Sequence, residues 1–173
     1  MQRRRLYVLS SLVVAVAALS ACRMPPPPPL HSVTGTGTST ATINTATGTG
    51  TGDGTFDLTH IGKGTTHNDF TSFTATGNTF AYTATGTLVV TDDDKANGNK
   101  ANGDKLFTTI AGTGTVTSTG SESTTVSTIT GGTGRFDDAS GTITFTDVGV
   151  TVSIVGSIVT STLTSTAQGQ ISY

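Results

Sequence analysis

The sequence predicts an all-β protein, a small antiparallel β-barrel of about eight strands. Its 173 residues include 40 Thr, 16 Ser and 22 Gly, and charged residues make up only 12%. Thr and Gly are poor helix formers, and no segment has the period of an amphipathic helix. Short segments instead alternate apolar residues with Thr, and Gly or Asn-Gly separates them. This spacing indicates a barrel or sandwich, and closure into a barrel removes exposed sheet edges.

The composition also excludes several classes of protein. A single cysteine cannot form a disulfide within the chain. A formal net charge of −2 and a pI near 5.8 argue against a nucleic-acid partner. Glycine alternates with threonine and does not recur at every third position, so a collagen repeat is excluded.

Residues 1–21 have the order of an export signal: a positive segment at residues 3–5, an uncharged apolar run, and small residues. The apolar run is shorter than the roughly 20 residues that a spanning helix needs. The ending Leu19-Ser20-Ala21-Cys22 resembles the lipobox of bacterial lipoprotein signals at all four positions. The resemblance implies cleavage before Cys22 and lipidation of that cysteine. Two alternatives are an ordinary secretory signal with an incidental cysteine and an uncleaved N-terminal anchor helix.

Residues 22–54 are expected to form a tether. Five consecutive prolines, Pro25 to Pro29, predict a stiff polyproline II rod. From His31 to about Gly54 the chain is mostly Thr, Gly, Ser and Ala, which have little to bury, so much of this part is expected to be flexible. The Thr-x-Thr alternation also suits a strand, and the latter half of the segment could add a first strand to the domain.

The domain is expected to span residues 55–173. In Thr142–Thr146 the apolar residues lie on one face and Thr on the other, and Val150–Ile154 repeats the pattern. Asn97-Gly98 and Asn102-Gly103 predict hairpins, because both residue types accept the positive φ of a type I′ turn. The other predicted strands are Phe56–Gly64, Asp69–Thr76, Thr79–Thr91, Leu106–Ile110, Val126–Thr130, Ile158–Thr166 and Gln170–Tyr173.

The segment Ile129-Thr130-Gly131-Gly132-Thr133-Gly134-Arg135-Phe136-Asp137-Asp138-Ala139-Ser140-Gly141 resembles a segment of allene oxide cyclase-like and dirigent-like barrels. His60–Gly64, Ala101–Leu106 and the ending Gly169–Tyr173 resemble bacterial secreted relatives. The resemblance covers the predicted domain and implies an eight-stranded barrel with an apolar interior. Plant members are oxylipin cyclases or coupling-control proteins, and some bacterial barrels of this type close rings in natural-product synthesis.

The residues of this motif have a structural interpretation of their own. Glycines permit φ values that are closed to other residues, so Gly131, Gly132 and Gly134 would let the chain turn sharply while Phe136 inserts into the end of the barrel. Gly141 would then restart a strand. A phosphate loop is excluded, because no Gly-Lys-Ser/Thr and no following helix is present. Arg135 is expected to form a surface ion pair with Asp137 or Asp138.

Candidate catalytic residues are few. His60 and His67 are an odd number of positions apart, which puts them on opposite faces of one strand unless a turn intervenes, and a zinc site needs three or four converging ligands. The run Asp92-Asp93-Asp94 fails the calcium-loop register at Ala96. We therefore expect no metal and no cofactor.

Asp147 is the one weak catalytic candidate. By alternation it shares a face with Ile143 and Phe145, and an interior carboxylate could act as a general acid or base. The alternative is that the strand ends at Thr146 and that Asp147 lies in a turn before Gly149.

The sequence favours a lipid-anchored protein of the bacterial cell envelope, on the extracytoplasmic side. After cleavage the chain would keep six basic and eleven acidic residues, a net charge of −5, so its membrane contact should be the lipid on Cys22. The barrel is expected to be non-enzymatic and to bind a small apolar ligand or serve a structural role. The alternative is a cyclase or isomerase that acts on an apolar substrate in the cavity.

Overall fold

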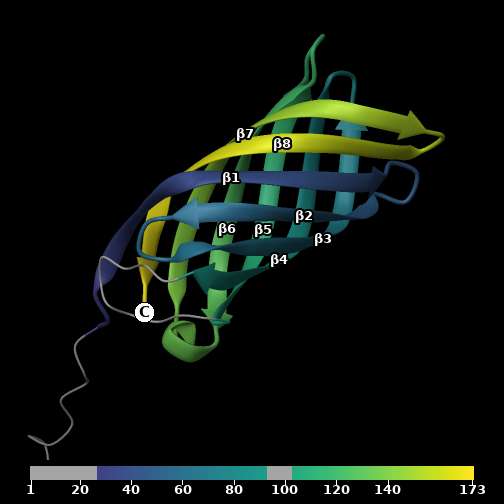
Figure 1. The fold of residues 1–173 in the computed structure, drawn as a ribbon. Coiled ribbons are helices and arrows are strands. Elements are labelled where there is room, and N and C mark those ends of the chain that lie inside the picture. The colour runs from purple at the N-terminus through teal and green to yellow at the C-terminus, as the bar shows by residue number, and fades with distance from the viewer. Residues whose placement is uncertain (1–26, 93–102) are drawn as a thin grey trace, which may run out of the picture.

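A computed structural model describes residues 27–92 and 103–173. Its eight strands form a closed antiparallel barrel in which each strand pairs with its neighbour in sequence, and β1 closes on β8 (Figure 1). One turn of 3-10 helix, η1 (Gly134–Phe136), lies between β6 and β7. The strands are β1 (Leu30–Asn44), β2 (Thr49–Leu58), β3 (Gly62–Thr76), β4 (Thr79–Asp92), β5 (Lys105–Val116), β6 (Ser121–Gly132), β7 (Ser140–Val155) and β8 (Ile158–Ser172).

The barrel begins earlier than the sequence analysis placed it. Residues 30–54, predicted as a tether whose latter half could add a first strand, form β1, a turn and the first half of β2. β1 is paired with β8 over its whole length, from Leu30 opposite Ser172 to Asn44 opposite Ile158. A Thr-Gly strand has little apolar surface of its own, but backbone hydrogen bonds to two neighbouring strands hold it in place. The domain therefore extends from Leu30 to the C-terminus.

Several predicted segments merge into longer strands. The segments at residues 142–146 and 150–154 are parts of β7, and those at 158–166 and 170–173 fall largely within β8. The glycines between them, Gly149 and Gly169, do not end the strands, because single glycines are tolerated where another backbone approaches closely. Gly169 is such a position, since a Cβ there would overlap the carbonyl oxygen of Thr142 on β7. The observed number of eight strands therefore includes β1, which was not among the predicted strands, and counts each merged pair of predicted segments as one strand.

The apolar core fills one end of the barrel, which we call the plug end. There β1 begins, β8 ends, and η1 lies across the opening, close to the C-terminus (Figure 1). The opposite end, the hairpin end, carries the turns that join β1 to β2, β3 to β4, β5 to β6 and β7 to β8. The plug consists of Val33, Phe56, Leu58, Ile61, Leu88, Val90, Leu106, Ile129, Phe136, Ala139, Ile143, Ala167 and Ile171.

Some sequence predictions fall outside the described residues. They include the signal at residues 1–21, the lipidation site Cys22, and the Asn97-Gly98 turn. Within residues 27–92 and 103–173 there is no helix long and apolar enough to cross a membrane.

Candidate functional site

The Gly-Gly-Thr-Gly motif closes the plug end. Gly131, Gly134 and Gly141 have φ values of 136°, 62° and 143°, a region that residues with a Cβ rarely adopt. These turns direct Phe136 into the barrel, where its side chain is fully buried. The motif is therefore part of the plug, and Phe136 is its largest fully buried side chain.

Arg135 does not form the ion pair that the sequence suggested. Its guanidinium donates a hydrogen bond to the backbone oxygen of Ile61. It also lies 4.5 Å from the ring centroid of Phe136 and 5.7 Å from that of Tyr173. Because Phe136 is buried, the adjacent Arg135 lies over the plug. There its guanidinium contacts the rings of Phe136 and Tyr173 and the carbonyl of Ile61. Asp137 and Asp138 remain exposed.

Asp147 points into the barrel from β7. Its side chain is buried, at 6% exposure, and the strand continues past it to Val155. The interior interpretation of Asp147 is therefore correct, and its placement in a turn is wrong. The carboxylate accepts hydrogen bonds from Thr125 Oγ1 at 2.6 Å, Ser123 Oγ at 3.2 Å and Ser165 Oγ at 2.5 Å. β6 supplies the first two hydroxyls and β8 supplies the third, so both neighbours of β7 position the carboxylate.

Tyr82 extends this network across the interior from β4. Its hydroxyl shares a short hydrogen bond with Thr125 Oγ1, which in turn donates to Asp147. Burial raises the pKa of the Tyr82 phenol, and the negative charge of Asp147 raises it further, although hydrogen bonds from Thr125 and Ser123 oppose the shift. At neutral pH the phenol is therefore protonated and can donate a hydrogen bond. We call Tyr82, Ser123, Thr125, Asp147 and Ser165 the Asp147 cluster.

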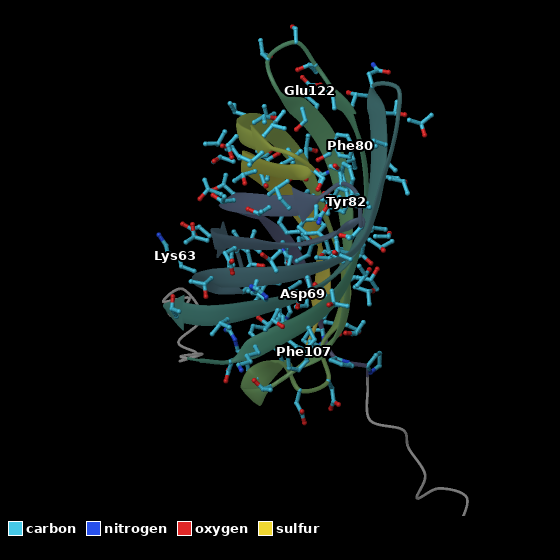
Figure 2. The ribbon with its side chains drawn as sticks, turned by 90° about the vertical axis from the view of Figure 1, so that its right-hand side faces the viewer. Lys63, Asp69, Phe80, Tyr82, Phe107 and Glu122 are labelled. Atoms are coloured by element: carbon cyan, nitrogen blue, oxygen red, sulfur yellow. The ribbon has the colours of Figure 1, made fainter. Side chains whose placement is uncertain are left out.

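A row of aromatic rings continues from Tyr82 along β3 and β4. Phe70 meets Tyr82 edge-on at 5.4 Å between ring centroids, and Phe80 stacks on Tyr82 at 6.3 Å. Phe73 stacks on Phe80 at 5.6 Å. Figure 2 shows Phe80 and Tyr82 in the upper part of the barrel, whereas Phe107 lies near its lower end. These half-buried rings bring apolar surface close to the polar groups of the Asp147 cluster.

Glycines on β5 make room for these rings. A Cβ at Gly112 would overlap the ring of Tyr82, and one at Gly114 would overlap the ring of Phe80. Thr108, on the same strand, lies nearer the plug end. Its hydroxyl is buried and has no hydrogen-bond partner within residues 27–92 and 103–173. An unpaired buried hydroxyl is costly, so Thr108 offers a hydrogen bond to any molecule that reaches the interior.

His60 and His67 do not share a strand. His60 occupies the turn between β2 and β3 with a φ of 63°, and the ring of His31 lies 5.0 Å from its ring. His67 lies on β3 and is exposed. Of the two predicted arrangements, the one with an intervening turn is therefore correct, because the turn between β2 and β3 separates the two residues. In the described part of the chain, no group of three or more His, Cys, Asp or Glu residues is placed to hold a metal ion.

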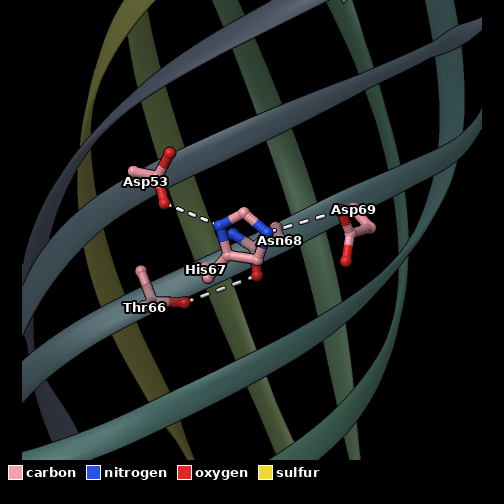
Figure 3. Close-up of polar contacts among 5 residues, drawn as sticks. All are labelled: Asp53, Thr66, His67, Asn68 and Asp69. Carbon is pink, nitrogen blue, oxygen red and sulfur yellow. Dashed lines mark hydrogen bonds and ion pairs between the residues drawn. The ribbon is translucent and has the colours of Figure 1, made fainter.

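His67 is held between two carboxylates on the outside of the barrel (Figure 3). Its Nδ1 lies 2.6 Å from Asp53 Oδ1, and its Nε2 lies 3.4 Å from Asp69 Oδ1. The hydrogen bond to Asp53 is the main cause that raises the pKa of His67 above 6.5. The sequence did not predict this arrangement, because Asp53 lies in the segment expected to be a tether. The pairing of Asp53 with His67 in the β2–β3 register could have revealed it.

The Asp147 cluster can orient a molecule chemically, because it combines a buried carboxylate, a protonated phenol and several hydroxyls beside aromatic rings. It contains no pair of a histidine and a nucleophile. Comparisons with protein-family models, with curated proteins and with solved structures found no match to this chain.

Proposed function

We propose that this protein is a lipid-anchored, extracytoplasmic β-barrel that binds a small, largely apolar molecule in its interior without transforming it. The observation that carries the proposal is the buried carboxylate of Asp147, which three hydroxyls fix on the interior wall. Buried ionised groups are costly and are retained where they are hydrogen-bonded. Apolar pockets with a few fixed polar groups are the usual form of small-molecule sites.

The parts of the interior have separate roles in this proposal. The rings of Phe70, Phe73 and Phe80 supply apolar contact surface at the hairpin end. The Asp147 cluster orients a polar group of the ligand, and the hydroxyl of Thr108 provides a further hydrogen bond. The plug closes the other end, so a ligand would enter from the hairpin end.

The anchor would lie at the plug end. Ser172 Oγ donates a hydrogen bond of 3.2 Å to the backbone oxygen of Pro28, so the start of the described chain lies beside the C-terminal strand. Cys22 precedes Pro27 by five residues, a distance of at most about 17 Å when fully extended. A lipid on Cys22 would therefore hold the plug end near the membrane and direct the hairpin end away from it.

The ligand proposal is tested by native mass spectrometry of the full chain after incubation with an extract of cellular lipids. We expect a bound species in the wild type, and a loss of at least tenfold in occupancy for Asp147→Asn. Asp137→Asn, an exposed aspartate at η1, is the matched control and should keep the bound species. A wild-type spectrum of protein alone would contradict ligand binding.

The anchor is tested separately, by incorporation of labelled palmitate in cells. Cys22→Ala should abolish the label because the thiol is the group that would carry the lipid. Equal labelling of the variant and the wild type would overturn the lipoprotein assignment. That result would leave the ligand proposal unaffected.

A second candidate function is an isomerase or cyclase that acts on an apolar substrate in the same interior. It is favoured by the position of Asp147 next to the hydroxyl chain that leads to Tyr82, because a carboxylate and a protonated phenol can serve as base and acid. If the bound molecule is released with a changed structure, and Asp147→Asn stops the change without abolishing binding, the enzymatic function is the correct one. Release of the unchanged molecule supports the binding function.

A further inference from the structure

A shallow groove, largely open to solvent, lies on the outer wall of the barrel where β7, β8 and β1 lie side by side. It has a volume of about 660 Å³ and lies toward the plug end. It is separate from the interior, because its polar side chains belong to outward-facing positions. Those side chains are Ser32, Thr34, Thr142, Thr144, Gln168 and Gln170.

No charged side chain projects from the walls of this groove. Residues 30–52 and 148–173 contain no Asp, Glu, Lys or Arg, and they include all of β1 and β8, which pair with each other. The one charged residue of β7, Asp147, faces the interior. The aspartates and lysine of β2 and β3 lie on another part of the wall, where Lys63 pairs with Asp57 at 2.9 Å. A charged ligand would find no counter-ion in the groove.

The polar side chains of the groove are also unengaged. Elsewhere on the wall, outward threonines bond to each other across strands, as in Thr38 with Thr55 at 3.2 Å and Thr71 with Thr83 at 2.9 Å. Within the described residues, none of the six groove side chains makes a hydrogen bond to another protein group. Their hydroxyls and the amides of Gln168 and Gln170 supply both hydrogen-bond donors and acceptors.

From this we propose that the groove binds a neutral oligosaccharide. A polyol needs many uncharged donors and acceptors, and the groove provides them without a charge to desolvate. Successive outward side chains on a strand are about 6.6 Å apart, so the six side chains form a grid that an extended chain of sugars can follow. Leu30, 61% exposed at the edge of the groove, adds an apolar contact for the C–H face of a sugar ring. An apolar peptide would find only this one large side chain projecting into the groove.

The test is isothermal titration calorimetry of the full chain in mild detergent with cellohexaose, maltohexaose and chitohexaose. We expect at least one of these neutral hexaoses to bind. The double variant Gln168→Ala/Gln170→Ala should weaken that binding about tenfold or more. A second variant, Thr142→Val/Thr144→Val, keeps the β-branched shape of the strand and should weaken it about fivefold. Circular dichroism would establish that both variants retain the barrel.

The matched control is Thr85→Val/Thr109→Val, which removes two outward threonine hydroxyls that face each other on β4 and β5. It should bind the hexaose as the wild type does. The proposal is overturned if no hexaose binds, or if the control and the groove variants lose affinity equally. It is also overturned if sedimentation reveals a dimer that the groove variants dissociate, because the occupant of the groove is then a second copy of the chain. Occupancy of the interior is measured independently by the lipid experiment, so the two proposals can fail separately.

Discussion

The two ends of the barrel interior contain different kinds of side chain. At the plug end, Leu58, Ile61, Phe136 and Ile171 are almost completely buried among other apolar side chains. Toward the hairpin end, hydroxyls, a carboxylate and half-buried rings line the same strands. The plug stabilises the fold by apolar burial, and the other half is held by strand pairing and hydrogen bonds. The two halves are therefore expected to differ in how much their side chains contribute to stability.

The largest effect is expected from a change in the plug. Phe136→Ala would leave a cavity in a fully buried site and should lower the free energy of unfolding by about 3–5 kcal/mol. Phe107→Ala is the matched control on the outer wall, where Phe107 is 39% exposed, and should cost about 1 kcal/mol or less. Urea unfolding measures both. Equal losses would mean that stability is spread along the barrel and that the comparison between its ends is wrong.

A smaller loss is expected from the buried carboxylate. Asp147→Ala removes the acceptor of three hydroxyls and should cost about 2–4 kcal/mol in unfolding free energy, because hydrogen bonds to charged groups exceed neutral ones. Asp147→Asn keeps one acceptor oxygen and should cost about half as much. The same urea unfolding assay separates the two variants. An Asp147→Ala protein as stable as the wild type would show that the network contributes nothing to the fold.

Parts of both ends of the barrel could be predicted from the sequence alone. Alternation in β7 was sufficient to place Ile143, Phe145 and Asp147 on one face, and the glycine motif was sufficient to place Phe136 in the barrel end. Asp147 faces the interior because β7 continues through Gly149. A single glycine can either lie within a strand or end it, so the sequence did not distinguish the two positions of Asp147. That distinction required the neighbouring strands, which supply all three of its hydrogen-bond donors.

β1 illustrates the opposite case. Its Thr-Gly alternation has the composition of a flexible linker, and only Val33 and Ala41 of the strand are buried apolar residues. The strand exists because β8, more than a hundred residues later, and β2 hydrogen-bond to its two edges. Pairing with a strand so distant in the sequence cannot be recognised from the sequence of β1 itself. A polar linker of the same composition would show the same Thr-Gly alternation. The contact of Asp53 with His67 was missed for another reason: the two residues face each other across the β2–β3 hairpin, but Asp53 was placed in the tether.

Tyr82 allows the polar half to be tested by pH. Tyr82→Phe should cost about 1 kcal/mol at neutral pH, the value of one net hydrogen bond. The raised pKa of the folded phenol also predicts a slope. The unfolded chain loses this proton from about pH 10 upward, earlier than the folded chain, so stability falls as pH rises toward the folded pKa. Unfolding at several alkaline pH values should show a shallower fall in Tyr82→Phe than in the wild type. Identical slopes would mean that the phenol is not buried in solution.

The smallest effect is expected on the outer wall, where His67 should influence neither end of the interior. Because the hydrogen bond to Asp53 is the main cause of its raised pKa, Asp53→Asn should lower that pKa more than Asp69→Asn does. NMR titration of the imidazole C2 proton measures both changes. The stabilising contribution of the pair is fully present below the unfolded pKa of His, near 6.5, and is lost as pH rises through the raised folded value. If Asp53→Asn leaves the titration unchanged, β2 does not hold its register against β3 in solution. The Thr-Gly strands β1 and β2 would then be the least stable part of the barrel wall. The main difference in stability would lie between two sides of the wall, and the difference between the two ends would be smaller.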